Sequence, residues 1–186
     1  MSKGLSGLFH GTMGTTHVNG SQTDTTYADR GIEIPEHIKQ TISKLNRKGD
    51  YVSSDGDNYP IKDVSIMSKE TGVEYAKLSI GGKSYLIRGD KNGVDVPGEL
   101  LSKLTKEGGK FDFHSHPYDN DCIPSARDRE TIRRISKATG QKTSQIVTPN
   151  GRTVIFDQHG VIETGNVSNI IDNEAKETYM KLFGGK

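Results

Sequence analysis

The segment KFDFHSHP, residues 110–117, constrains the fold of this chain more than any other stretch of its sequence. Its side chains alternate as they do in a β-strand, and Pro117 ends the strand because proline has no N–H to donate to a neighbouring strand. After a short loop, Ser125 and Asp128 open a helix in the S-x-x-D arrangement of a capping box, and Gly140 can end it. A strand followed by a helix in this way favours an α/β fold.

Further helices and strands are predicted on both sides of this unit. Gly81-Gly82 and Asn150-Gly151 are dipeptides typical of hairpin turns, whereas residues 50–70 show no clear pattern. The predicted elements are a helix at 35–48, strands at 73–80 and 83–88, a helix at 96–109, two strands within 144–157 and a terminal helix at 168–183. Together they predict a single α/β domain with a mixed β-sheet flanked by helices.

Composition limits the organisation of the chain and its partners. A length of 186 residues fits one domain with a substantial core. Residues 1–33 are rich in Gly, Ser and Thr and are predicted to be a flexible leader or linker, with the folded domain at 34–186. Lysine and arginine total 25 against 24 acidic residues, so the sequence predicts no nucleic-acid partner and no membrane partner.

The cellular setting is also constrained by the sequence. No stretch is apolar enough for a membrane span or for the core of a secretory signal. The single cysteine, Cys122, excludes an intrachain disulfide, which fits a reducing compartment. We expect a cytoplasmic protein, or one delivered as part of a larger effector, because the leader is similar to the linkers that join effector domains to delivery proteins.

The two histidines of the 110–117 strand form the most specific chemical feature. Residues two apart on a strand point to the same side, so His114 and His116 project together while Ser115 points away. Asp128, in the first turn of the following helix, can face the end of this strand. Two histidines and one aspartate leave a zinc ion one open coordination position, which is the composition of a catalytic site.

The stretch HSHPYDNDCIPSARD, residues 114–128, resembles the His-x-His-Pro-x(n)-Ser-x-x-Asp signature of the JAMM metallopeptidases, also called JAB or MPN+ proteins. These are zinc isopeptidases that include deubiquitinating enzymes. The resemblance implies a cytidine-deaminase-like domain, one zinc ion per chain on His114, His116 and Asp128, and a protein or peptide substrate that includes ubiquitin-like conjugates. It also implies that Ser125 stabilises the oxyanion. Residues 117–124 make the loop one residue longer than the family pattern.

The resemblance further implies an upstream glutamate that acts as the general base. Glu74 shares a strand face with Ala76, Leu78 and Ile80, where an unpaired carboxylate would be costly without a function. Glu70 lies in SKETG, which is typical of a solvated turn. We therefore predict Glu74 as the base and keep Glu70 as the alternative.

Three other functions compete with this prediction. Cys122 beside two histidines could be a nucleophile, although a lone cysteine is more often a small apolar core residue. The start FDFHSHP also resembles that of barrel metallohydrolases, but such barrels run to about 250 residues and the chain is too short. The third is an MPN domain that serves as a binding scaffold, with or without metal, and this alternative stays open.

Overall fold

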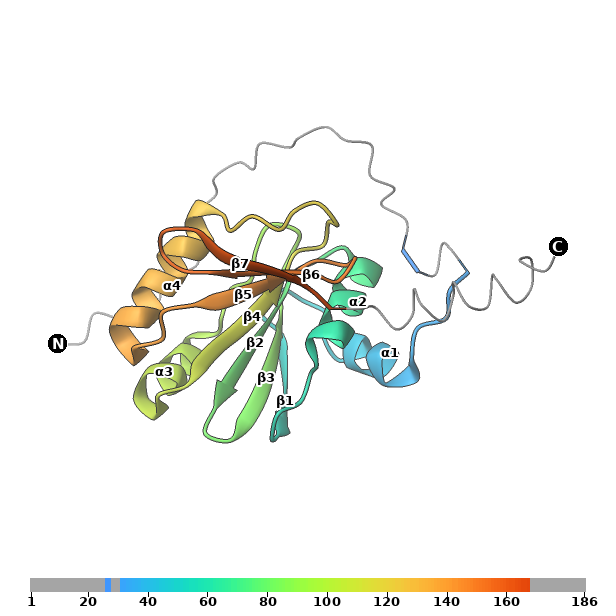
Figure 1. Ribbon diagram of the computed structural model, residues 1–186. Coiled ribbons are helices and arrows are strands. Elements are labelled where there is room, and N and C mark those ends of the chain that lie inside the picture. The colour runs from blue at the N-terminus through green and yellow to red at the C-terminus, as the bar shows by residue number, and fades with distance from the viewer. Residues whose placement is uncertain (1–25, 28–30, 168–186) are drawn as a thin grey trace.

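The computed structural model describes residues 26–27 and 31–167 and forms one seven-stranded sheet with four helices (Figure 1). The strand order is β1-β3-β2-β4-β5-β6-β7; β4 and β5 run parallel and all other neighbours antiparallel. The elements are α1 (Glu36–Ser43), β1 (Tyr51–Asp55), α2 (Ile61–Thr71), β2 (Tyr75–Ile80), β3 (Lys83–Arg88), α3 (Gly98–Glu107), β4 (Lys110–Ser115), α4 (Ala126–Thr139), β5 (Ser144–Val147), β6 (Arg152–Phe156) and β7 (Val161–Asn166). The predicted α/β class with a mixed sheet flanked by helices is confirmed.

The helices cover both faces of the sheet and so make two cores. Figure 1 shows α3 and α4 on one face, and α1 and α2 on the other. We call the α3/α4 side the first core; its buried residues include Ala76, Leu78, Ile87, Leu100, Leu104, Ile132, Ile146 and Phe156. The α1/α2 side is the second core and includes Tyr27, Ile38, Val64, Met67, Tyr75, Leu86, Phe113 and Val147. Burial of these apolar side chains on both faces of the sheet stabilises the fold.

Several elements confirm the sequence predictions. The β2–β3 hairpin turns at Gly81 and Gly82, whose φ angles of 58° and 76° are strained for other residues. Helices α1, α3 and α4 and the β5–β6 hairpin lie where they were predicted. Helix α4 ends at Gly140 in the left-handed conformation, with φ of 81°. The terminal helix predicted at 168–183 lies outside the described residues.

Two predictions near the N-terminus need correction. Glu70 was predicted in a turn, but it lies in the last turn of α2. Most of the predicted leader lies outside the described residues, whereas Tyr27 is only 1% exposed and belongs to the second core. Its backbone N–H donates a hydrogen bond to the Glu70 carboxylate, with 3.0 Å between the two atoms. The folded part of the chain therefore includes Tyr27, ahead of the predicted boundary at 33.

A β-bulge in β4 sets the direction of the side chains that follow it. Lys77 lies opposite Phe113 and Leu78 opposite Phe111, so Asp112 is an extra residue in β4. The bulge lets Phe111 pack in the first core and Phe113 in the second, which a regular alternation would not allow. After the bulge, the strand resumes its alternation and runs into the two histidines.

Candidate metal centre

Four predicted site residues meet where β4 ends. His114 is in β4, His116 follows it, Glu74 directly precedes β2, and Asp128 lies in the first turn of α4. Because β2 and β4 are antiparallel and Ala76 lies opposite His114, the residue two before Ala76 comes level with the residue two after His114. Strand pairing thus brings Glu74 to the histidines from a distant part of the sequence.

The ligand atoms of this cluster lie close enough to share one cation. The Nε2 atoms of His114 and His116 are 3.1 Å apart. Two ligands of a tetrahedral zinc ion, each at about 2.0–2.1 Å, would be about 3.3 Å apart. Glu74, His114 and His116 each offer an atom within 4.8 Å of the others. Asp128 adds Oδ1 at 3.3 Å from His114 Nε2 and Oδ2 at 3.9 Å from His116 Nε2. The buried group of Glu74, His114 and His116 could hold a metal ion.

The two imidazole rings are held by different contacts. His116 Nδ1 lies 2.6 Å from the backbone oxygen of Asp121, and because a carbonyl can only accept, this nitrogen carries the proton. The lone pair of neutral His116 is then on Nε2, facing His114. His114 packs between Phe111 and Phe156, each with a ring centroid 6.0 Å away, and its buried Nδ1 has no hydrogen-bond partner among the described residues.

This arrangement fits a cation between the histidines. If one Nε2 carries a proton, it donates to the other across 3.1 Å; if both rings carry their proton on Nδ1, the two lone pairs face each other and can share a cation. Within the described residues, no hydrogen bond at Nδ1 decides which nitrogen of His114 carries the proton. A metal ion bound at Nε2 would place that proton on Nδ1. The donor set of two imidazoles and carboxylates suits zinc and several other divalent transition metals.

The electrostatics of the cluster favour a positive charge at its centre. Glu74 as a whole residue is partly exposed, but its carboxylate is enclosed, and this burial raises the pKa of Glu74 to about 7. Burial alone would lower the pKa of His116, but Asp121, Glu74 and Asp128 outweigh it and raise the pKa to about 9. The pKa of Asp128 is held well below its usual range because the two histidines outweigh the effect of burial. The negative field that favours a proton on His116 equally favours a metal cation.

Ser125 fixes the start of α4 and the position of Asp128. Its Oγ accepts the Asp128 N–H at 3.2 Å, and its own N–H donates to Asp128 Oδ2 at 2.7 Å. These two bonds form the predicted capping box. The longer loop at 117–124 therefore still brings both residues to the end of β4, and Asp128 retains Oδ1 for the histidine side of the cluster.

The alternative residues are placed outside this group. Glu70 is not in the group of Glu74, His114 and His116, and its carboxylate accepts a hydrogen bond from the Tyr27 N–H. Cys122 is buried, at 6% exposure, and is likewise not in the group. Sequence reasoning missed the residues that orient the rings, namely Phe111, Phe156 and Asp121, because no local pattern marks a residue that acts through packing or a backbone oxygen.

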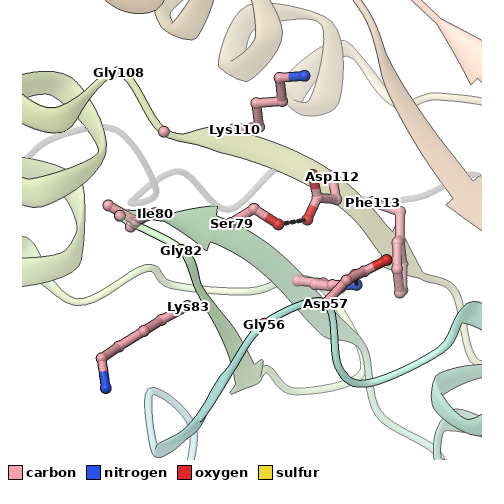
Figure 2. Close-up of a pocket in the computed structure, with 13 residues that line it drawn as sticks. Gly56, Asp57, Ser79, Ile80, Gly82, Lys83, Gly108, Lys110, Asp112 and Phe113 are labelled. Atoms are coloured by element: carbon pink, nitrogen blue, oxygen red, sulfur yellow. Dashed lines mark hydrogen bonds and ion pairs between the residues drawn. The ribbon is translucent and has the colours of Figure 1, made fainter.

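A groove of about 640 Å³ lies elsewhere on the sheet (Figure 2). It is lined by the face of β2 and β4 that carries Lys77, Ser79 and Asp112, beside the glycine turns at 81–82 and 108–109. Some of its charged groups have partners within the protein: Lys77 pairs with Asp57, and Ser79 donates to Asp112. None of the four clustered residues lines it, so the groove and the candidate metal centre are separate features.

No family model matches the chain, and neither any curated protein nor any solved structure matches it. The case for a function therefore rests on the residues and their geometry. Within residues 26–27 and 31–167, no helix combines the length and the apolar character that crossing a membrane requires.

Proposed function

We propose that this protein is a zinc-dependent hydrolase of peptide or isopeptide bonds, of the JAMM type that its motif resembles. The observation that carries the proposal is the convergence of the two histidine Nε2 atoms with the carboxylates of Asp128 and Glu74 at the end of β4. Two imidazoles and two enclosed carboxylates form the ligand set and the base that metal-assisted hydrolysis needs.

The positions of the two carboxylates support different roles. Asp128 contacts both Nε2 atoms and is held in place by the Ser125 N–H, so we assign it, with His114 and His116, to the metal. Glu74 approaches from the neighbouring strand and is assigned as the general base. When bound, zinc acts as a Lewis acid that polarises a carbonyl group and lowers the pKa of a water molecule toward neutral pH.

Glu74 would move the proton that hydrolysis requires. Its carboxylate accepts a proton from water as the water oxygen attacks the scissile carbonyl carbon. The same group then gives this proton to the amine nitrogen as the carbon–nitrogen bond breaks. Burial raises the pKa of Glu74 to about 7 in the metal-free protein, and a metal cation beside it would lower this pKa and favour the carboxylate form that accepts the proton.

Ser125 is assigned to the developing oxyanion. Accepting the Asp128 N–H occupies one lone pair of the Ser125 oxygen and leaves its hydroxyl proton to donate. A donor aimed at the oxyanion stabilises the transition state more than the substrate. The substrate class we propose is a protein or peptide, including ubiquitin-like conjugates.

The proposal is tested by metal content and cleavage. Wild-type protein should carry about one equivalent of zinc by mass spectrometry, and His114→Ala with His116→Ala should carry none, because two of three ligands are lost. The matched control is His37→Ala with His159→Ala, which removes two exposed histidines and should keep the zinc. Wild type should also cleave a member of a panel of peptide-linked and isopeptide-linked ubiquitin-like substrates.

Two outcomes would count against it. Stoichiometric zinc in the His114/His116 double variant would show that the ligands are wrong. A zinc-loaded wild type that cleaves nothing in the panel would favour the MPN-like binding scaffold.

A further inference from the structure

A chain of ion pairs reaches the first turn of α4. Arg127, the neighbour of Asp128, donates from Nη2 to Asp95 Oδ1 at 3.0 Å. The other oxygen of Asp95 lies 2.9 Å from Lys48 Nζ, which is also 2.8 Å from Asp90 Oδ2. We call Lys48, Asp90, Asp95 and Arg127 the bracket. It joins α4 to the segment that follows β3.

The other end of the bracket holds Glu74. The Glu74 N–H donates to the backbone oxygen of Asp90 at 3.0 Å, and the Gly89 N–H donates to the backbone oxygen of Glu74 at 2.8 Å. Val94 and Val96, each 6% exposed, anchor the same segment in the first core. Residues 89–96 therefore contact the glutamate side of the metal centre through the backbone and the aspartate side through an ion pair.

The Arg127 guanidinium packs closely against Gly93. A Cβ atom added at Gly93 would lie 2.7 Å from Arg127 Nη1, and the φ of Gly93 is 151°. The guanidinium thus lies directly against the Gly93 backbone, and a side chain there would push it aside. A substitution at Gly93 would displace Arg127 without changing any charge, and it would also strain the backbone, because other residues rarely adopt this φ.

Isolated surface ion pairs contribute little to stability. The Arg127–Asp95 pair is therefore judged by its exposure and by the elements that it joins. Arg127 and Asp95 are each 29% exposed, and Lys48 is 35% exposed. By contrast, Lys83 and Asp55 are 50% and 88% exposed and join two neighbouring strands. The bracket connects α4, which carries Asp128, to residues 89–96, which hydrogen-bond the backbone of Glu74, and its arginine is one residue from a proposed ligand.

We propose that Arg127 and Asp95 are positioning residues that set Asp128 against Glu74 and the histidines. This inference rests on the proposed function, because it assigns a role only if the cluster binds metal. Neither residue touches the metal or the substrate; both act by fixing where α4 begins relative to residues 89–96. Contacts that orient metal ligands in this way typically change metal affinity by about 10-fold to 100-fold when removed.

The test compares metal affinity with stability in variants of the whole chain. Arg127→Gln, Asp95→Asn and Gly93→Ala should each bind zinc about 10-fold more weakly in competition with a chelator, and should change the visible spectrum of the Co²⁺-loaded protein. Arg127→Lys should restore part of the affinity. Asp55→Asn, which removes the Lys83 ion pair, should leave affinity and spectrum unchanged. The melting temperature of each metal-free variant is the control for folding. Weaker zinc binding with an unchanged melting temperature indicates a displaced ligand, whereas a lower melting temperature indicates a destabilised fold.

A double-mutant cycle completes the test. If Arg127 and Asp95 act as a pair, the Arg127→Gln, Asp95→Asn double variant should be little worse than either single variant. Affinity and spectrum equal to wild type in all three single variants would overturn the positioning role while leaving the metal centre intact. A wild-type protein that takes up no metal would instead overturn the proposed function, and this assignment with it.

Discussion

Glu74 is the residue whose placement most needs a function. Its carboxylate is enclosed beside Asp128 and two histidines, and burial raises its pKa to about 7. Enclosing a carboxylate is unfavourable unless a partner or a metal compensates. Its ordinary alternative, Glu70, is occupied with the Tyr27 N–H and stabilises the second core instead.

Glu74→Gln should separate catalysis from metal binding. The amide keeps the shape of the side chain but cannot take a proton, so zinc content should stay near one equivalent while turnover falls by about 100-fold or more. Metal content by mass spectrometry and turnover on the cleaved substrate are the two measurements. Glu70→Gln is the matched control and should keep its turnover. Loss of turnover in Glu70→Gln with full turnover in Glu74→Gln would reverse the assignment.

The same substitution should change stability in a pH-dependent way in metal-free protein. A carboxyl whose pKa is raised on folding, from 4.5 to about 7, destabilises the fold once it must ionise. Glu74→Gln should therefore gain stability over wild type as the pH rises from about 4.5 to about 7, and keep the gain above that range. Melting curves at pH 5 and pH 8 measure this difference.

At the scale of elements, the start of α4 serves both fold and site. Ser125 caps the helix and Asp128 closes the capping box, so the same two residues that begin the helix also deliver a carboxylate to the histidines. An N-cap alone would explain Ser125 without any catalytic role. The two roles are separable by experiment.

Ser125→Ala should reduce stability and turnover by different mechanisms. Loss of the cap should lower the free energy of unfolding by about 1 kcal/mol. If the hydroxyl also donates to the oxyanion, turnover should fall by about 100-fold, far more than that loss of stability explains. Ser125→Thr, which keeps a hydroxyl, should retain most of both. A drop in stability with unchanged turnover would leave Ser125 as a cap only.

The elements that sequence reasoning found have strong local signals, and those it missed do not. Helix α2 begins in the unassigned stretch 50–70. Its buried Ser65 and Ser68 donate to backbone oxygens, so polar residues occupy core positions and the apolar periodicity of the helix is weak. Strand β7 is exposed along its whole length and shows no apolar alternation. The bulge at Asp112 depends on the pairing with β2, which the sequence of β4 alone does not specify.

The residues of the candidate metal centre also differ in how strongly the local sequence marks them. His114, His116, Ser125 and Asp128 are close in sequence, and their spacing predicted how a strand end and a helix start would meet. For Glu74, the resemblance implied an upstream glutamate, and the cost of a carboxylate on a buried strand face favoured Glu74 over Glu70. The bracket had no signal, since Asp95 and Arg127 are ordinary surface residue types until the fold brings them together.

At the scale of the whole molecule, the second core extends beyond its sheet and helices. Tyr27 is 1% exposed and packs with residues of α1, α2, β3 and β4, and Ile32 and Ile34 continue the same contact. The Ile32 N–H donates to the Tyr27 backbone oxygen at 2.9 Å. Tyr27, Ile32 and Ile34 are thus part of the structure that supports the β4 strand.

Truncation should measure that contribution. A flexible leader at residues 1–33 would be dispensable for folding, but deleting residues 1–30 removes the buried Tyr27 and should destabilise the protein. Tyr27→Ala should lower the free energy of unfolding by about 3 kcal/mol or more, as for other large buried aromatic residues, which is about 6–12 °C in melting temperature for a domain of this size. Deleting only residues 1–25 keeps Tyr27 and is the matched control. Equal melting temperatures for the 1–25 and 1–30 deletions would show that Tyr27 adds nothing, whereas a lower value for the longer deletion, matched by Tyr27→Ala, would place the start of the domain before residue 27.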